Sequence, residues 1–288
     1  MMHRNRILIS RRNFLRASAA TAAAALAGPK RSFSDSSSGI GNPNLFWREP
    51  EDKAVPPGAV IGGEPSGFIP GHIHYRGGQW REHPLAMSAL LHEVRKRTSI
   101  KAGPYSKVVG LSSAELFNYP FLYISGRYEF EAPDDNEVDR LRRHLTYGGF
   151  LLVDDGLGML NEGFGRSARI LLQRIFPRNA LEPLPTDHAM FKSYYLIRSI
   201  GGRQAKSQEL EGIRLGRFTP VVFCRNDLGG AWAQLPDGRW TQECTPGGEA
   251  QRKSAFNLGV NIVLYALTGN YKQDLIHHPI IQRRLNQG

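Results

Sequence analysis

The sequence predicts an α/β fold built around a parallel sheet, and residues 121–155 carry the prediction. Two short, continuously apolar runs, at residues 121–124 and 150–153, are typical of strands that are buried on both faces. Between them, apolar residues recur from Val138 to Leu145 with the period of a helix that buries one face. Strand, helix and strand in this order form a βαβ unit, whose two strands lie parallel in one sheet. Their carboxyl ends then share one edge of the sheet, where open α/β sheets bind ligands.

The other elements of the domain follow from the same rules. Asp134 and Glu137 predict a capping-box start for the central helix, and Gly148 predicts its end. Apolar spacing, together with flanking proline or glycine, locates the remaining elements. These are helices at 84–97, 168–175 and 249–267, strands at 72–75, 107–111 and 219–224, a helical turn at 112–116, an extended segment at 181–185 and a hairpin at 232–241.

The first 27 residues carry the features of a twin-arginine export signal. Arg11 and Arg12 stand in the segment SRRNFLR, an alanine-rich apolar stretch follows, and small residues at Ala25 and Ala27 form a cleavage pattern. We expect cleavage after Ala27 and export of the folded protein to the periplasm. A helix that spans a bilayer needs about 20 apolar residues, and no stretch approaches that length, so we expect no transmembrane helix in the mature chain.

The sequence divides into four parts. After the signal at residues 1–27, residues 28–70 are rich in glycine, proline and serine and lack an apolar period, which predicts an arm or linker. Its apolar cluster at residues 45–47 is a candidate anchor to the domain. The α/β domain is expected over residues 71–272, followed by a peripheral tail at residues 273–288.

The net charge indicates which partners to expect, and the cysteine content bears on the redox state of the protein. The formal net charge is +11, but the signal contains five arginines and no acidic residue, so the mature chain keeps +6. This charge is scattered, which favours a solvated surface, and we expect no nucleic-acid partner. The two cysteines, Cys224 and Cys244, are 20 residues apart. A disulfide between them would stabilise the fold by roughly 3 kcal/mol in an oxidising periplasm, and two free thiols are the alternative.

Several polar side chains follow the predicted strands directly and should gather at the carboxyl edge of the sheet. They are Arg76, Arg127, Asp154, Asp155, Asn226 and Asp227. The adjacent carboxylates Asp154 and Asp155 are candidate ligands of a divalent cation, and nearby arginines would hold an anionic group. The competing interpretation is local, because Asp and Asn at strand ends accept hydrogen bonds from backbone N–H groups in turns.

A catalytic hypothesis adds His188, because the preceding Asp187 would orient it for acid–base work or metal binding. The candidate catalytic set is Asp154, Asp155, His188 and Asp227. A surface histidine in a loop is the alternative. His72 and His74 share one strand face, but a pair without a third ligand is a weak metal signal. The sequence contains neither a phosphate-binding glycine pattern nor a nucleophile elbow.

Six segments resemble, in order, the bacterial family called domain of unknown function 4159: IHYRGGQWREHP, FNYPFLYISG, LRRHLTYGGFLLVDDG, LPTDHAMF, RNDLGGAWA and PGGEAQRKSAFNLGVNIVLYALTGNYKQD. The resemblance spans residues 72–274. It implies a flavodoxin-like three-layer sandwich, similar to class I glutamine amidotransferases and to ThuA-like proteins, but no established activity. It also implies a cell-envelope partner, because members are often encoded near membrane-associated complexes with von Willebrand A domains and MoxR-type ATPases.

Differences from these relatives limit the chemistry. In a glutamine amidotransferase, the strand at residues 150–153 would deliver a nucleophilic cysteine, and Asp154 and Asp155 stand there instead, which excludes amidotransfer by that route. The segment that begins at Asp187 is similar to the Asp-His-Pro segment of ThuA-like proteins, with Ala189 in place of the proline.

Two functions follow from the sequence. The first is a periplasmic module that binds a ligand or a partner protein at the carboxyl edge without turnover, with Arg76, Arg127 and Asn226 as candidate contacts. The second is a metal-assisted hydrolase or carbohydrate-active enzyme that uses Asp154 and Asp155, with a divalent metal as cofactor. Three side chains converging on an open coordination position would favour the enzyme, and carboxylates turned into backbone N–H groups would favour the binder.

Overall fold

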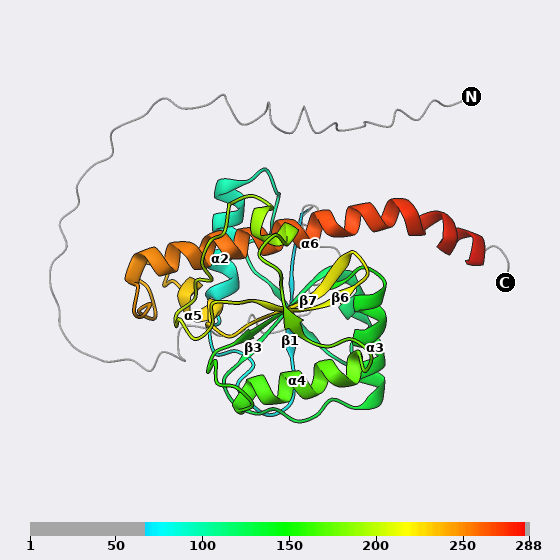
Figure 1. The fold of residues 1–288 in the computed structure, drawn as a ribbon, viewed down its shortest axis with the longest axis horizontal. Helices are drawn as coiled ribbons and strands as arrows, with labels where there is room; N and C mark the ends of the chain where they lie inside the picture. Colours follow the sequence, from blue (N-terminus) through cyan, green and yellow to red (C-terminus); the bar gives the residue numbers. More distant parts are fainter. Residues whose placement is uncertain (1–66, 286–288) are drawn as a thin grey trace, which may run out of the picture. The chain divides into compact units, whose positions relative to one another are not determined.

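A mostly parallel sheet lies at the centre of the fold (Figure 1). The computed structural model describes residues 67–285, with side chains as far as residue 268, and the sheet in this part has seven strands. They are β1 (Gly71–His74), β2 (Lys107–Gly110), β3 (Phe121–Gly126), β4 (Phe150–Asp155), β5 (Glu182–Pro183), β6 (Glu211–Leu215) and β7 (Phe218–Cys224). The order is β2-β1-β3-β4-β7-β6-β5, in which the first five strands are parallel and β6 joins β7 antiparallel.

The order of the parallel strands is that of flavodoxin-like folds. It confirms the predicted fold class, an α/β sandwich with a mostly parallel central sheet. The order reverses between β1 and β3, because the chain leaves β1 toward β2 and then returns to the other side of β1. In such sheets, ligands bind outside the carboxyl ends of the strands at the point of reversal.

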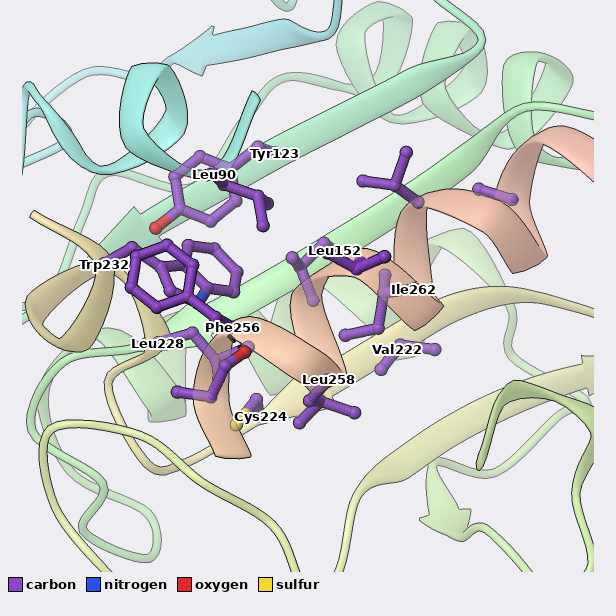
Figure 2. Close-up of a cluster of buried hydrophobic side chains, with 14 of the residues drawn as sticks. Leu90, Tyr123, Leu152, Val222, Cys224, Leu228, Trp232, Phe256, Leu258 and Ile262 are labelled. Carbon is purple, nitrogen blue, oxygen red and sulfur yellow. Dashed lines mark hydrogen bonds between the residues drawn. The ribbon is translucent and has the colours of Figure 1, made fainter. Parts of the chain in front are cut away.

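Helices cover both faces of the sheet (Figure 1). The described helices are α2 (Ala86–Arg97), α3 (Asp135–Thr146), α4 (Gly163–Ile175), α5 (Leu228–Trp232) and α6 (Gly248–Leu285), with 3-10 helices η2 (Ala114–Asn118) and η3 (Ala189–Lys192). One face packs against α2, α5 and α6, and the other against α3 and α4. Figure 2 shows Leu258 and Ile262 of α6 among side chains of β4 and β7 such as Leu152 and Val222.

The central βαβ unit forms as predicted. Strands β3 and β4 pair in parallel along their whole lengths. Helix α3 between them starts with a complete capping box, because Asp134 accepts from the Glu137 backbone N–H and Glu137 accepts from the Asp134 N–H. The predicted apolar residues Val138, Leu141 and Leu145 form its buried face. The local signals and the packing therefore agree in this unit.

Four elements differ from the sequence prediction: β6, α5, the hairpin and α6. Strand β6 and helix α5 were not predicted, and α5 takes in Trp232, the first residue of the predicted hairpin. That hairpin is reduced to a turn with one antiparallel bridge, between Gln234 and Trp240. Helix α6 continues to Leu285, through the residues predicted to form a peripheral tail. The export signal with Arg11 and Arg12, the cleavage after Ala27 and the apolar cluster of the arm lie outside the described residues.

The two cysteines are free in the structure. Cys224 ends β7, Cys244 lies in the loop before α6, and both thiols are buried in the same apolar core as α2, α5 and α6. The disulfide that the sequence left open is not formed here. Within residues 67–285, no helix is both long and apolar enough to cross a membrane.

Candidate functional site

The adjacent carboxylates at the end of β4 point to opposite faces of the sheet. Successive side chains of a strand alternate between its two faces. Asp154 therefore lies on the side of Leu152, facing α5, and Asp155 lies on the side of Val153, facing α4. The prediction that these two carboxylates jointly hold a cation is corrected by this divergence.

Asp154 holds the start of α5 against the sheet. Its Oδ1 accepts from the Leu228 N–H at 2.7 Å, and its Oδ2 accepts from the Gly229 N–H at 2.6 Å. The Tyr123 hydroxyl on β3 also donates to Oδ2, at 2.8 Å. Burial, followed by the charge of Asp227, raises the pKa of Asp154 to about 7, although these hydrogen bonds act in the opposite direction. The carboxylate is thus committed to backbone and hydroxyl donors.

Asp155 shapes the loop that follows β4. Its Oδ1 accepts from the backbone N–H groups of Leu157 and Gly158, both at 3.0 Å. Burial raises the pKa of Asp155 to about 6, with these two hydrogen bonds opposing the shift. This contact pattern is the local, turn-forming alternative that the sequence left open.

Asp227 begins α5 from a left-handed backbone conformation, with φ at 56°. Residues other than glycine rarely adopt this conformation, and Asp and Asn tolerate it best because their side chains bond nearby backbone groups. Asp227 Oδ1 accepts from the Gly230 N–H at 2.9 Å and so caps the short helix. The strain, of order 1 kcal/mol, is offset by contacts that this position makes possible.

Those contacts place the Asp227 carboxylate between two cationic side chains. His83 Nε2 lies 3.0 Å from Oδ1, and Arg203 donates from Nε to Oδ2. Burial opposes ionisation of Asp227, but His83 and Arg203 outweigh it and lower its pKa. Burial also opposes the charged form of His83, and here the neighbouring Asp227 and Glu82 carboxylates raise the pKa. Both shifts favour an ion pair.

Glu82 extends this arrangement to the point where the strand order reverses. Its Oε1 lies 2.5 Å from a terminal guanidinium nitrogen of Arg127 and 3.6 Å from His83 Nε2. Glu82 belongs to the loop after β1 and Arg127 to the loop after β3, so the pair joins the two strands that flank the reversal. Burial raises the pKa of Glu82, although the nearby cations oppose it.

We call these five side chains, Glu82, His83, Arg127, Arg203 and Asp227, the charge network. Asp227 is 1% exposed, Glu82 and His83 are each 7% exposed, and Arg203 is 17% exposed. Arg127 is the most accessible member, at 31%. Arg127 is therefore the member of the charge network that is most open to a ligand.

Two other predicted contacts are already engaged. Arg76 is largely exposed but pairs with Glu137 at 3.2 Å and with Glu131 at 3.7 Å. Asn226 is buried and forms hydrogen bonds with the loop that contains Ile200 and Ser207. Its amide N–H₂ donates to the carbonyls of both residues, and its Oδ1 accepts from the Ser207 N–H. Asn226 therefore positions the loop that carries Arg203 and offers no free group to a ligand.

His188 does not join the other predicted catalytic residues. Its Nε2 lies 3.0 Å from the Thr219 hydroxyl near the start of β7, whereas Asp154 pairs with Cys224 at the end of that strand. Five residues of strand separate the two positions by about 16 Å. His188 caps η3 through Nδ1 and packs on Tyr265, and burial lowers its pKa. Its role here is to pack the amino edge of the sheet.

The histidine pair on β1 packs around an aromatic ring. His72 and His74 both contact Trp80 edge-on, at ring-centroid distances of 5.5 Å and 4.9 Å. Burial lowers the pKa of His72 to about 4. Among the described residues, no three His, Cys, Asp or Glu side chains are grouped so that they could hold a metal ion.

Sequence reasoning missed Glu82, His83 and Arg203. The first two lie between a parallel strand and the helix that follows it, and such loops always reach the carboxyl edge, so their position was available from the sequence. Arg203 lies in a long segment without periodicity, and nothing in the sequence places it beside Asp227.

The charge network can bind charged groups but contains no nucleophile. The nearest thiol in the strand register is Cys224, opposite Asp154, and its burial raises the pKa well above the usual range, so it is not a thiolate at neutral pH. The His83–Asp227 pair has the composition of an acid–base dyad, but both side chains are almost fully buried.

Comparisons with known proteins identify two regions of the chain. Residues 71–267, about two thirds of the sequence, match the family described as Domain of unknown function (DUF4159). Residues 8–28 match the TAT (twin-arginine translocation) pathway signal sequence, which confirms the predicted export route. A search of curated proteins found no match.

Proposed function

Because the chain belongs to the family described as Domain of unknown function (DUF4159) and carries a twin-arginine signal, it is exported to the periplasm, and we propose that it binds a polar ligand there at the carboxyl edge of its sheet. The ligand is bound and released without a chemical change. It is either free in the periplasm or presented by a partner protein of a cell-envelope complex.

The observation that carries this proposal is the state of the edge carboxylates. Asp154 accepts three hydrogen bonds and Asp155 accepts two, and most of their donors are backbone N–H groups. Both oxygens of Asp154 and Oδ1 of Asp155 therefore serve to hold the loops around the site, and Asp155 Oδ2 is buried without a hydrogen-bond partner. The hydrolase alternative also needed His188, which lies at the other end of β7.

Arg127 is the group through which we propose that the ligand is recognised. It is the most exposed member of the charge network and lies where the strand order reverses. A guanidinium offers several N–H donors in one plane, which suits carboxylate, phosphate and sugar oxygens. Glu82 holds Arg127 in place, so part of the ordering cost of binding is met in the free protein.

The proposal is tested with the mature protein, Arg127→Gln and a matched control, Arg166→Gln. Arg166 is also a partly exposed arginine paired with a glutamate, 3.3 Å from Glu129, but it lies on α4. Thermal unfolding is measured with sugars, amino acids, dipeptides and organic acids. A ligand present at 100 times its Kd stabilises the folded state by about 2.7 kcal/mol. We expect one class to raise the Tm of the wild type and the control but not of Arg127→Gln.

Each ligand that shifts the Tm is then incubated with the protein and analysed by mass spectrometry. Recovery of unchanged ligand supports binding without turnover. Conversion to a product would overturn the proposal in favour of an enzyme, and equal Tm shifts in all three proteins would place the binding site elsewhere.

A further inference from the structure

A second feature, outside the charge network, lies along helix α3. A surface hollow of about 740 Å³ is lined by the exposed side of this helix and by Ser112, in the turn that follows β2. Helix α3 covers the face of the sheet opposite to α5 and α6 (Figure 1). The hollow is therefore bordered by two elements that take no part in the contacts around Asp227.

Most charged groups that line the hollow already have partners. Asp134 and Glu137 bond each other's backbone in the capping box, and Glu137 also pairs with Arg76. Asp139 pairs with Arg142. The guanidinium of Arg142 is turned toward α4, where it donates to the backbone carbonyls of Arg174 and Ile175. These groups hold the helices together and are not free to bind a ligand.

Two arginines of the hollow remain without such partners. The side chains of Arg140 and Arg143 form no hydrogen bond or ion pair with any described residue, and the buried Nε of Arg140 has no acceptor. They are three residues apart on α3, and Asn136 is four residues before Arg140, so these three side chains lie on one side of the helix. Ser112 lines the same hollow.

This combination has the chemistry of an oxyanion site. Guanidinium groups bind phosphate through paired N–H donors, and hydroxyl and amide groups supply further donors. We propose that Arg140 and Arg143, with Asn136 and Ser112, bind the phosphoryl group of a periplasmic ligand. The group is carried either by a small phosphorylated solute or by an anionic lipid headgroup.

The first test measures binding of inorganic phosphate by calorimetry, at low ionic strength and near neutral pH. Three proteins are compared: the mature wild type, Arg140→Gln/Arg143→Gln, and the control Arg178→Gln/Arg198→Gln. The control changes the net charge by the same amount at two exposed arginines that do not line the hollow. We expect saturable binding of phosphate to the wild type and the control. The Arg140→Gln/Arg143→Gln variant should bind phosphate with an affinity at least about tenfold lower. Equal binding by the two variants, or no binding to the wild type, overturns the proposal.

The second test distinguishes the two sources of the phosphoryl group. Sedimentation with phosphatidylglycerol vesicles is compared with sedimentation with phosphatidylcholine vesicles for the same three proteins. Binding to the anionic vesicles that depends on Arg140 and Arg143 assigns the site to a lipid headgroup, and phosphate binding without vesicle binding assigns it to a solute. Because these variants leave Arg127 intact, failure here and failure of the binding site at Arg127 give separate results.

Discussion

The buried carboxyl group of Asp154 makes a pH-dependent contribution to stability that can be predicted with its sign. The perturbation is Asp154→Asn, which keeps the shape of the side chain and removes its titration. In the wild type, burial and the charge of Asp227 raise the pKa of Asp154 from its ordinary value of 3.8 to about 7. The folded state therefore keeps a proton that the unfolded chain loses as the pH rises between these values.

The size of the effect follows from the shift. A group that binds its proton more tightly in the folded state makes the protein less stable as the pH rises, by about 1.4 kcal/mol for each unit of pKa difference. For Asp154, the loss amounts to ~4 kcal/mol between pH ~4 and pH ~7. The asparagine variant lacks this loss but turns an amide N–H₂ toward the Leu228 or Gly229 N–H, and the unsatisfied donor costs about 1–3 kcal/mol at every pH.

Urea unfolding of both proteins at several pH values tests this reasoning. At the acid end the wild type should be more stable than Asp154→Asn, and the difference should shrink or reverse toward neutral pH. Groups that do not interact with Asp154 titrate alike in both proteins and cancel in the difference, so the difference reports Asp154 together with its coupled neighbours Asp227 and His83. A stability difference that stays constant or grows with pH would refute the reasoning, because it would mean that the three donors around Asp154 stabilise its anion more than burial destabilises it.

Three further predictions concern the titration of His144, the space around Gly229 and the state of the two cysteines. Burial lowers the pKa of His144 from its ordinary value of 6.5 to about 4. Between these pH values the folded protein therefore keeps His144 neutral while the unfolded chain takes up a proton. Urea unfolding should show that the stability of the wild type falls by ~3 kcal/mol from pH ~6.5 to pH ~4 relative to His144→Leu. Gly229→Ala should cost about 1–3 kcal/mol, because a Cβ there would lie 2.7 Å from the Tyr123 hydroxyl, whereas Gly110→Ala, with its nearest atom at 3.9 Å, should change the unfolding free energy by less than ~1 kcal/mol. Ellman's reagent should detect no thiol in the native protein and two after unfolding without reductant, whereas a disulfide between Cys224 and Cys244 would give none in either state.

The elements that sequence predicted correctly are those whose local pattern agrees with their packing. The apolar runs of β3 and β4 are buried on both faces, and α3 begins at its capping box. Helix α5 had no such pattern, because LGGAW contains two glycines and is too short to be stable alone. It forms because Asp227 caps it locally and because Asp154, from a distant part of the chain, accepts from its first two backbone N–H groups.

The candidate site was predictable in part. The alternation of side chains along β4 alone indicates that Asp154 and Asp155 diverge, and the loop after β1 was bound to place Glu82 and His83 at the carboxyl edge. Two facts needed the structure. Arg203 meets Asp227 through a segment without periodicity, and His188 lies at the amino end of a strand whose carboxyl end holds the network.

The burial of the two thiols makes the order of folding and export important for this protein. A twin-arginine substrate folds in the cytoplasm, where thiols are kept reduced, and crosses the membrane afterwards. Cys224 and Cys244 are thus enclosed by the core before the chain reaches an oxidising compartment. A molecule that crossed unfolded would meet periplasmic oxidants with both thiols accessible and could be trapped by a wrong disulfide. Folding before transport therefore places both thiols inside the core before they can meet periplasmic oxidants.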